Sequence, residues 1–283
     1  MSGNKFVLIT GCSNGGIGSA LALTFQKRGF HVFASARDVS KMSALEGLPN
    51  VTHLMLDVTD PEQIQNALEF VRTKCRGSLD ILINNSGRNH FSPVLDIDLV
   101  EAKKIYDINV WGALMLIQKF APLIIEAKGS IVNVTSISGY VNVPYMGLYA
   151  ASKRSLELLS ETLRLELQPF GVYVLSVVTG AVRTNGQTYF EDWKLPEDSL
   201  YKPIETTIHG RARGGDGVPR MDTMEYADQV VNDIIGRSGD GRSWCGTNAE
   251  RTKPVSPALQ AIIDRYMSMG CGLDDLTNKL KET

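Results

Sequence analysis

Short apolar runs alternate with stretches of helical periodicity along most of the chain. Runs with the length and β-propensity of buried strands cover residues 5–10, 31–36, 51–56, 79–83, 130–135, 172–178 and, more briefly, 243–247. Apolar residues recur at helical spacing over residues 19–28, 61–74, 99–120, 149–167 and 223–235, and a last helix is expected at 258–267. This alternation predicts an α/β fold with a doubly wound, mostly parallel sheet.

Residues 185–222 interrupt the alternation. The segment contains Gly, Pro and charged residues together with the aromatics Tyr189, Phe190 and Trp193. Long irregular segments in compact domains are often functional, so we interpret it as a lid over an apolar substrate. The alternative, to which we give equal weight, is that these aromatics only pack the loop onto the domain. No linker separates two complete cores, so residues 1–283 are expected to form a single catalytic domain with a C-terminal extension at about 248–283.

Composition and charge narrow the function classes. The chain has 283 residues, 43% of them hydrophobic, and a formal net charge of −2, which gives no global attraction to nucleic acid or anionic membranes. The N-terminus lacks the pattern of a signal peptide, and the most apolar helical stretch, 113–125, is interrupted by Gln118, Lys119 and Pro122. We therefore expect no transmembrane segment and a cytoplasmic protein, with peripheral association with a lipid or endoplasmic-reticulum surface left open.

The cysteines carry no recognisable site. Cys12, Cys75, Cys245 and Cys271 are scattered, and the sequence contains no CxxC pair. This usage fits a reducing compartment and predicts neither a disulfide framework nor a metal site.

A glycine-rich turn follows the first expected strand. In GCSNGGIG (residues 11–18), glycines allow backbone N–H groups to approach a pyrophosphate, and the following helix N-terminus adds positive partial charge. The predicted cofactor-binding residues here are Gly11, Ser13, Asn14, Gly16, Ile17 and Gly18. The alternative is a tight turn without a ligand.

Residues at the ends of the next strands suggest which dinucleotide binds. Arg37 follows the second strand, where an arginine pairs with a 2′-phosphate, so NADP(H) is favoured. Asp38 weakens this argument, although it resembles the N-cap of the next turn. Asp57 and Val58 follow the third strand, and Asn84 ends the fourth. All three are predicted to contact the cofactor, and Asp57 is expected to accept a hydrogen bond from the adenine amino group. A solvated arginine and turn-capping side chains are the alternatives.

The candidate catalytic pair is Tyr149 and Lys153, at the start of the helix over 149–167. Residues four apart share a helix face, so the phenol and the ammonium can point to one place, and a nearby cation lowers the pKa of a phenol. Ser136 at the end of the preceding strand and Asn109 in the preceding helix add to this constellation.

Together these motifs resemble the short-chain dehydrogenase/reductase family. The motifs are TG…GxG at residues 10–18, NNxG at 84–87, the Asn in INVWG, Ser136 and YxxxK, and the match covers roughly residues 5–185. The resemblance implies a single Rossmann-type domain with a seven-stranded sheet, helices on both faces, and NAD(P)(H) as hydride carrier. It also implies roles for individual residues: Tyr149 as general acid/base, Lys153 on the nicotinamide ribose, Ser136 on the substrate carbonyl, Asn109 in a water relay, and Val182 and Thr184 at the nicotinamide carboxamide.

The chain departs from the family pattern at three places. Gly16 and Gly18 follow Gly11 at +5 and +7 instead of +4 and +6, Ser86 replaces the usual Ala, and Thr179 replaces the usual Pro. Within the family, TGCSNGGIG, ASAR and the tail are similar to a fungal subgroup that includes 1-acyldihydroxyacetone-phosphate reductase and, more loosely, to 17β-hydroxysteroid dehydrogenases. The resemblance implies NADPH-dependent reduction of a ketone, or oxidation of the alcohol, on a lipid-like or secondary-metabolite molecule. A non-redox or imine-reducing biosynthetic enzyme and a cofactor-sensing protein are the alternatives.

The expected substrate pocket lies between the loop at 138–148 and the segment at 185–222. Its candidate residues are Ser138, Tyr145, Met146 and Tyr189. The helix over 149–167 has a second apolar stripe containing Ala151, Leu158 and Leu165, which needs a partner. The same helix forms the usual dimer interface of the family, so a homodimer or homotetramer is expected.

Overall fold

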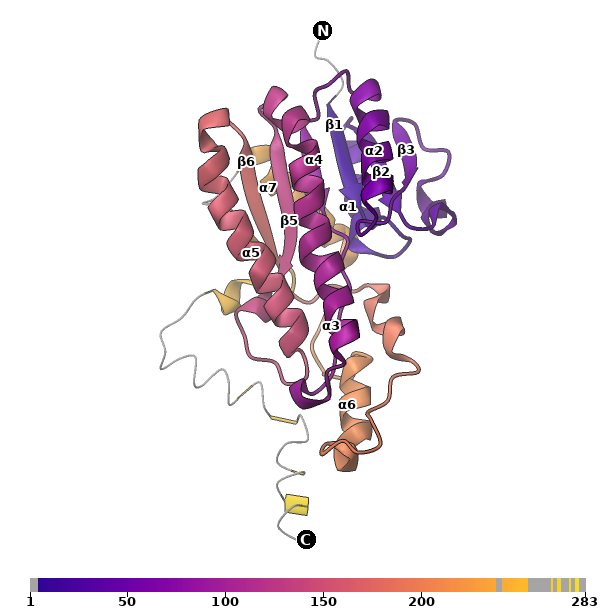
Figure 1. The fold of residues 1–283 in the computed structure, drawn as a ribbon, viewed down its shortest axis with the longest axis vertical. Helices are drawn as coiled ribbons and strands as arrows, with labels where there is room; N and C mark the ends of the chain where they lie inside the picture. Colours follow the sequence, from indigo (N-terminus) through magenta and orange to yellow (C-terminus); the bar gives the residue numbers. More distant parts are fainter. Residues whose placement is uncertain are drawn as a thin grey trace.

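The computed structural model describes residues 5–237 and 241–253, and residues 266, 269, 270, 275, 278 and 279. The expected helix at 258–267 and most of the C-terminal extension lie outside the described residues. Figure 1 shows a twisted sheet covered by helices on both faces, with a smaller helical region beneath its lower end.

The sheet has the predicted doubly wound topology. Its seven strands are β1 (Phe6–Thr10), β2 (His31–Ala36), β3 (Val51–Met55), β4 (Ile81–Asn84), β5 (Ser130–Ser136), β6 (Tyr173–Thr179) and β7 (Arg242–Cys245). They lie in the order β3-β2-β1-β4-β5-β6-β7, and every pairing is parallel. The strand order reverses between β1 and β4, which is where such sheets open a ligand crevice at their carboxyl ends.

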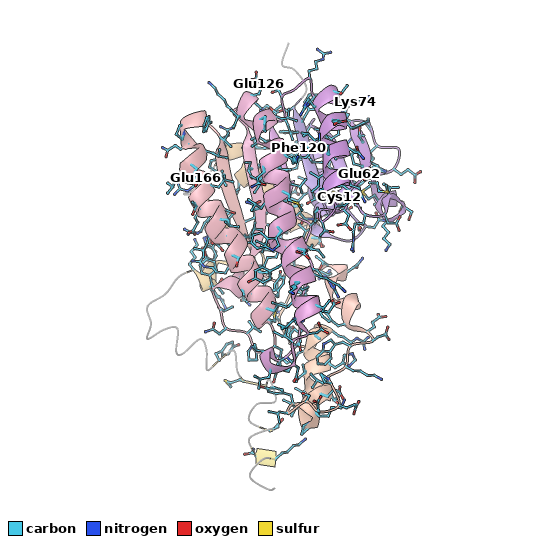
Figure 2. The ribbon with its side chains drawn as sticks, in the orientation of Figure 1. Cys12, Glu62, Lys74, Phe120, Glu126 and Glu166 are labelled. Atoms are coloured by element: carbon cyan, nitrogen blue, oxygen red, sulfur yellow. The ribbon has the colours of Figure 1, made fainter. Side chains whose placement is uncertain are left out.

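The helices divide between the two faces of the sheet. They are α1 (Ile17–Lys27), α2 (Pro61–Lys74), α3 (Leu99–Tyr106), α4 (Ala113–Glu126), α5 (Gly147–Leu167), α6 (Glu205–Ala212) and α7 (Thr223–Gly236). α2, α4 and α5 lie in front of the sheet in Figure 1, and α1 and α7 lie behind it. Each face has its own apolar core: Phe25 and Tyr226 are fully buried in the rear core, and Phe120 in the front core. Figure 2 labels Phe120 on α4.

The helix expected at 99–120 is longer and is interrupted. α3 and α4 are joined by a π-helical turn, Asp107–Gly112, and α4 continues to Glu126. π-helical turns inside α-helices are frequent at functional sites, and this one contains Asn109. Apolar periodicity cannot detect it, because a single turn of wider pitch shifts the pattern by only one residue.

The combined segment Leu99–Glu126 is long and apolar enough to cross a membrane, judged by length and composition alone, with a mean hydropathy of 1.6. Half of its most apolar window is buried inside the protein, and Leu116, Phe120 and Ile124 of α4 belong to the front core. A core helix of a soluble fold has the same properties, so this finding is weak evidence for a membrane span. The expected absence of a transmembrane segment stays a prediction.

The segment at 185–222 is more ordered than its sequence suggested. It contains 3₁₀ turns at Asn185–Phe190 and Lys202–Ile204 as well as α6. A third apolar cluster forms here, with Phe190 buried against Phe91 and Ile208 fully buried. Trp193 stacks on His209 with ring centroids 6.2 Å apart. Phe190 therefore packs this segment onto the domain, and its role as a lid stays a prediction.

Candidate active site

The glycine loop between β1 and α1 has the close contacts that only glycine allows. Gly11 and Gly15 adopt positive φ values of 73° and 70°, a conformation that other residues rarely adopt. A Cβ on Gly18 would lie 2.3 Å from the Gly11 carbonyl oxygen. The loop is thus held tightly against the N-terminus of α1, whose N-cap, Gly16, offers no side chain to its free N–H groups. Such a turn fits an anionic phosphate group.

Asn14 turns away from the loop it belongs to. Its side chain donates to Ser43 Oγ at 2.7 Å and accepts from Ala44 N at 3.0 Å, and its N–H donates to the Lys41 carbonyl at 2.7 Å. These bonds tie the glycine loop to the 3₁₀ segment Val39–Leu45. The side chain and the N–H of Asn14 therefore already have partners within the protein, and its contact with a cofactor stays a prediction. Ser13 and Ile17 flank the same loop and are partly buried.

Arg37 and Asp38 have different environments. Arg37 is exposed at the end of β2 and has no ion-pair partner among the described residues. The Asp38 carboxylate accepts from Ser40 N at 3.0 Å and from the Ser40 hydroxyl at 2.6 Å, and these hydrogen bonds lower the pKa of Asp38. Asp38 is therefore an N-cap, which leaves Arg37 available for a 2′-phosphate.

Asn84 lies in the core at the end of β4. Its side chain is buried and donates to Asn133 Oδ1 on β5 at 2.8 Å, and Asn133 in turn donates to Ser160 Oγ on α5 at 2.7 Å. This chain of amides joins two strands and a helix inside the core. Asn84 Oδ1 is buried without a hydrogen-bond partner among the described residues, and its contact with a cofactor stays a prediction.

Asp57 and Val58 lie in the turn after β3. The Asp57 carboxylate accepts from the N–H and the hydroxyl of Thr59 at 2.9 and 2.8 Å. This is the turn-capping arrangement named as the alternative, and it occupies one of the two carboxylate oxygens. Val58 is buried, and its carbonyl oxygen would lie 2.7 Å from a Cβ on Gly112.

Asn85, the second residue of NNSG, has a structural role that its sequence position did not predict. Its side chain donates to the Thr10 and Gly11 carbonyls at 2.8 and 3.2 Å, while its N–H donates to Thr10 Oγ1 at 3.1 Å. Asn85 therefore fixes the glycine loop to the end of β4. The paired asparagines in the motif were the available signal, and they have separate roles in the fold.

The candidate catalytic residues come together at the carboxyl end of β5. The Ser136 hydroxyl hydrogen-bonds the Tyr149 hydroxyl. Ser136 Oγ also accepts from Ser138 N at 3.1 Å and lies 2.9 Å from Ser138 Oγ. β5 supplies Ser136 and α5 supplies Tyr149, so the pair is formed only when this helix packs on this strand.

Lys153 lies behind Tyr149 in the core. Its side chain is 5% exposed, and Nζ donates to the Val134 carbonyl at 2.9 Å and lies 5.9 Å from the centre of the Tyr149 ring. Burial lowers the pKa of Lys153 to about 8. Gly87 allows this arrangement, since a Cβ there would lie 3.1 Å from Lys153 Nζ and 3.3 Å from Asn109 Oδ1.

Asn109 secures the other side of Gly87. Its Oδ1 accepts from Arg88 N at 2.8 Å, and its Nδ2 donates to the Arg88 carbonyl and to Ser152 Oγ, both at 3.0 Å. The side chain thus connects the π-helical turn to the loop after β4 and to α5. The water relay to Lys153 stays a prediction.

The pKa of Tyr149 differs from the expectation that a nearby ammonium lowers it. Burial raises the pKa of Tyr149 above its usual range, and the hydrogen bond from Ser136 opposes this shift. The phenol therefore stays protonated at neutral pH in the protein alone. The Lys153 ammonium, 5.9 Å from the centre of the ring, does not outweigh the effect of burial on this pKa.

The segment after β6 reaches back to the glycine loop. Val182 is buried and bridges to Met221, and Thr184 caps the next turn by accepting from Gly186 N at 3.3 Å. The Asn185 side chain donates to the Asn14 carbonyl at 3.2 Å. It also packs closely on Gly15, since a Cβ there would lie only 2.6 Å from Asn185 Nδ2. Val182 and Thr184 are thus placed beside the cofactor loop.

A groove of about 630 Å³ lies along the loop at 138–147, but it is not above Tyr149. Ser138 and Tyr145 line it, and Met146 packs in the third apolar cluster. From α5 the groove takes Gly147, Ala150, Ala151 and Arg154, which lie on the side of the helix opposite Tyr149 and Lys153 at about 100° per residue. Neither Ser136 nor Tyr149 lines this groove, and the side chain of Tyr189 is outside the described residues.

No cluster of three or more metal-ligating side chains occurs in the described part of the chain. The described part of the site brings together hydroxyl groups, a buried ammonium and a glycine-rich turn.

Comparisons with known proteins agree with this arrangement. A family model described as short chain dehydrogenase matches residues 5–195. The chain is 48% identical over 235 residues to "Short-chain dehydrogenase PC-15" of Penicillium crustosum, covering 83% of this chain and 86% of that protein. It is 41% identical over 242 residues to "NADPH-dependent 1-acyldihydroxyacetone phosphate reductase" of Schizosaccharomyces pombe, covering 84% and 80%. A short chain dehydrogenase from Burkholderia cenocepacia, solved in complex with NADP, superposes with a TM-score of 0.72 at 25% identity, covering 93% and 94% of the two chains.

Proposed function

The chain belongs to the short-chain dehydrogenase family, and on that premise we propose that it reduces a ketone of an apolar, lipid-like or secondary-metabolite molecule with NADPH, or oxidises the corresponding alcohol. The observation that carries the proposal is the hydrogen-bonded pair of Ser136 and Tyr149, with the buried Lys153 ammonium behind it. A phenol and a hydroxyl that share one point can both donate to a single carbonyl oxygen.

The residues at the carboxyl end of the sheet fit NADP(H). The glycine loop leaves no room for side chains at Gly11 and Gly18, so backbone N–H groups are what it presents to a pyrophosphate. Arg37 would take the 2′-phosphate, and Val182 and Thr184 would lie at the nicotinamide end. When bound, this cofactor supplies or accepts the hydride.

The chain's own residues handle the proton. Tyr149 donates its phenolic proton to the carbonyl oxygen as negative charge develops there, and Ser136 donates a second hydrogen bond to the same oxygen. The Lys153 ammonium then stabilises the phenolate, which recovers its proton from solvent. In the oxidation direction each transfer runs in reverse, with Tyr149 as the base.

The apolar character of the substrate is inferred from its surroundings. Phe91, Tyr145 and Phe190 form the third cluster next to the site, and the fission-yeast relative is named for an acylated ketone. The test is loss of NADPH absorbance with a panel of acylated, polycyclic and small ketones. Turnover that favours the apolar members supports the proposal; absence of turnover with tight NADPH binding refutes it and favours a cofactor-sensing protein.

The cofactor preference should depend on Arg37. For Arg37→Ala we expect NADPH affinity to fall about 10- to 100-fold, since hydrogen bonds to a charged group contribute about 1.5–3 kcal/mol, while NADH affinity changes by less than about threefold. Fluorescence titration with both cofactors measures this. Lys27→Ala, an exposed cation in the last turn of α1, is the control and should leave both affinities unchanged. Equal loss for both cofactors would contradict the assignment.

We also propose a cytoplasmic homodimer or homotetramer that forms through α5. Leu158 and Leu165 on this helix are 49% and 59% exposed, and Trp111, in the π-helical turn before α4, is 49% exposed. Light scattering should give at least twice the 31.0 kDa chain mass, and Leu158→Glu with Leu165→Glu should lower it to that of the monomer. Met55→Glu, equally exposed but on the edge strand β3, should not. A monomeric wild type would exclude the assembly.

A further inference from the structure

A carboxylate with no role in the proton transfer is completely buried beside the active site. Glu157 lies on α5 four residues after Lys153, and its side chain has no exposed surface. Burying an ionised carboxylate costs several kcal/mol unless partners compensate it. The partners of Glu157 therefore indicate which contacts this buried carboxylate maintains.

Glu157 connects three separate elements through a single oxygen, Oε1. The Tyr140 hydroxyl donates to it from the loop that follows β5. Arg242 Nε on β7 donates to it at 3.2 Å, and Arg154 Nη1 on α5 lies 3.4 Å away. The carboxylate therefore holds the loop, the last strand and the catalytic helix at one point.

The Tyr140 ring is fixed as firmly as its hydroxyl. The Arg154 guanidinium lies over the ring at 4.8 Å from its centre, and the Trp244 ring is centred 4.9 Å away at an angle of 56°. Cation–π and aromatic contacts of this kind add to the hydrogen bond. Tyr140 is thus restrained by both α5 and β7.

Tyr140 closes the short loop that begins at Ser136. Ser136 Oγ accepts from Ser138 N at 3.1 Å, and Tyr140 N donates to the Ile137 carbonyl at 2.9 Å. Between them Gly139 packs directly on α5, because a Cβ there would lie 3.3 Å from Arg154 Cβ. Residues 136–140 therefore form one compact turn, with the Ser136 hydroxyl at one end and the Tyr140 hydroxyl at the other.

We propose that the Tyr140–Glu157 hydrogen bond, braced by Arg242, is a positioning contact that sets the Ser136 hydroxyl relative to Tyr149. Tyr149 and Glu157 are on the same helix, so anchoring the turn to Glu157 fixes Ser136 in the frame of α5. Misplacing a catalytic group by a fraction of an ångström weakens bonds made only in the transition state. The inference rests on the proposed ketone reduction.

The test begins with Tyr140→Phe, which removes one hydroxyl and keeps the ring. Using NADPH and the best ketone of the panel, kcat should fall about tenfold, while KM for the ketone and Kd for NADPH stay within about twofold. Tyr106→Phe is the matched control: its phenol hydroxyl lies 3.5 Å from Ser155 Oγ on α5 but does not touch the turn, and kcat should not change.

A second variant checks that the two groups act through one contact. Glu157→Met, which has no oxygen to accept the Tyr140 hydroxyl, should lower kcat about as much as Tyr140→Phe does. The double variant should lose no more than the more impaired of the two single variants, because both remove the same bond. NADPH binding and thermal unfolding confirm that each variant is folded, and kcat is expressed per folded molecule. If Glu157→Met does not fold, Tyr140→Phe decides alone.

The outcomes separate this inference from the function on which it rests. No turnover by the wild type defeats the proposed function. An active wild type with unchanged kcat per folded Tyr140→Phe molecule overturns the positioning role, as does a melting temperature that falls while kcat is retained. Losses in the two single variants that add in the double variant also overturn it.

Discussion

Replacing Tyr149 with Phe should abolish most of the turnover and leave cofactor binding intact. The substitution removes the one proton that the site can donate at the carbonyl, and general acid catalysis contributes about 10²–10⁴-fold to a rate. We expect kcat to fall by at least that range, while Kd for NADPH changes by less than about threefold. Steady-state NADPH oxidation measures the first and fluorescence titration the second.

The Tyr106→Phe protein again serves as the control, because it loses a phenol hydroxyl next to α5 but away from Ser136. A Tyr149→Phe protein that turned over at the wild-type rate would remove Tyr149 from the mechanism. Equal losses of turnover and NADPH affinity would point instead to a role in cofactor binding.

Replacing Lys153 with Met should make the protein inactive and more stable at the same time. Turnover should fall about 10²-fold or more, because no ammonium remains to stabilise the Tyr149 phenolate. The pKa of Lys153 falls from 10.5 to about 8 on burial. At about 1.4 kcal/mol per pKa unit, the buried charge costs up to about 3 kcal/mol of folding free energy at pH 7. The methionine removes that cost.

The sign of the pH dependence follows from which state holds the proton. Between pH 8 and 10.5 the unfolded chain keeps Lys153 protonated while the folded protein releases that proton, so this group makes wild-type stability rise with pH in that window. The advantage of Lys153→Met should therefore be full below pH 8 and vanish as the pH approaches 10.5. Urea unfolding at pH 7 and pH 10 measures it, with the exposed Lys103→Met on α3 as control. A variant less stable than the wild type at pH 7 would refute the argument.

The buried lysine and Glu157 show a shared feature of this site. Both are ionisable side chains on the core side of α5, and both are almost completely removed from water. Replacing buried charges with apolar groups is often neutral or stabilising. We therefore explain their retention here by the two proposed roles: Lys153 stabilises the Tyr149 phenolate, and Glu157 holds the turn at residues 136–140. The two substitutions test these roles independently, since Lys153 acts on Tyr149 and Glu157 acts on Ser136.

The fold was largely predictable because its signals are local. Strands buried on both faces need continuous apolar runs, and all seven expected runs form parallel strands. Asp38 at the head of its turn and Pro61 in the first turn of α2 also behave as their positions indicate. The grouping of the candidate catalytic residues was predictable for the same reason, because Tyr149 and Lys153 share one helix and Ser136 ends the neighbouring strand.

Contacts between distant segments were not predictable in this way. The core position of Asn84 depends on Asn133, 49 residues away, and Asn85 depends on the glycine loop 74 residues before it. The apolar cluster around Phe190 and Ile208 depends on Phe91. Each of these side chains has several plausible roles in isolation, and only its neighbour in space selects one.

By itself, then, the sequence determined the strands, the glycine turn and the grouping of Ser136, Tyr149 and Lys153, because each is written in neighbouring residues or in a repeating period. The tertiary structure alone decided the protonation of Tyr149 and Lys153, the π-helical turn at Asn109 and the contact of Tyr140 with Glu157. The physical reason is that a pKa or a buried hydrogen bond is set by everything within a few ångströms, and in this fold those surroundings come from β5, α5 and β7 together.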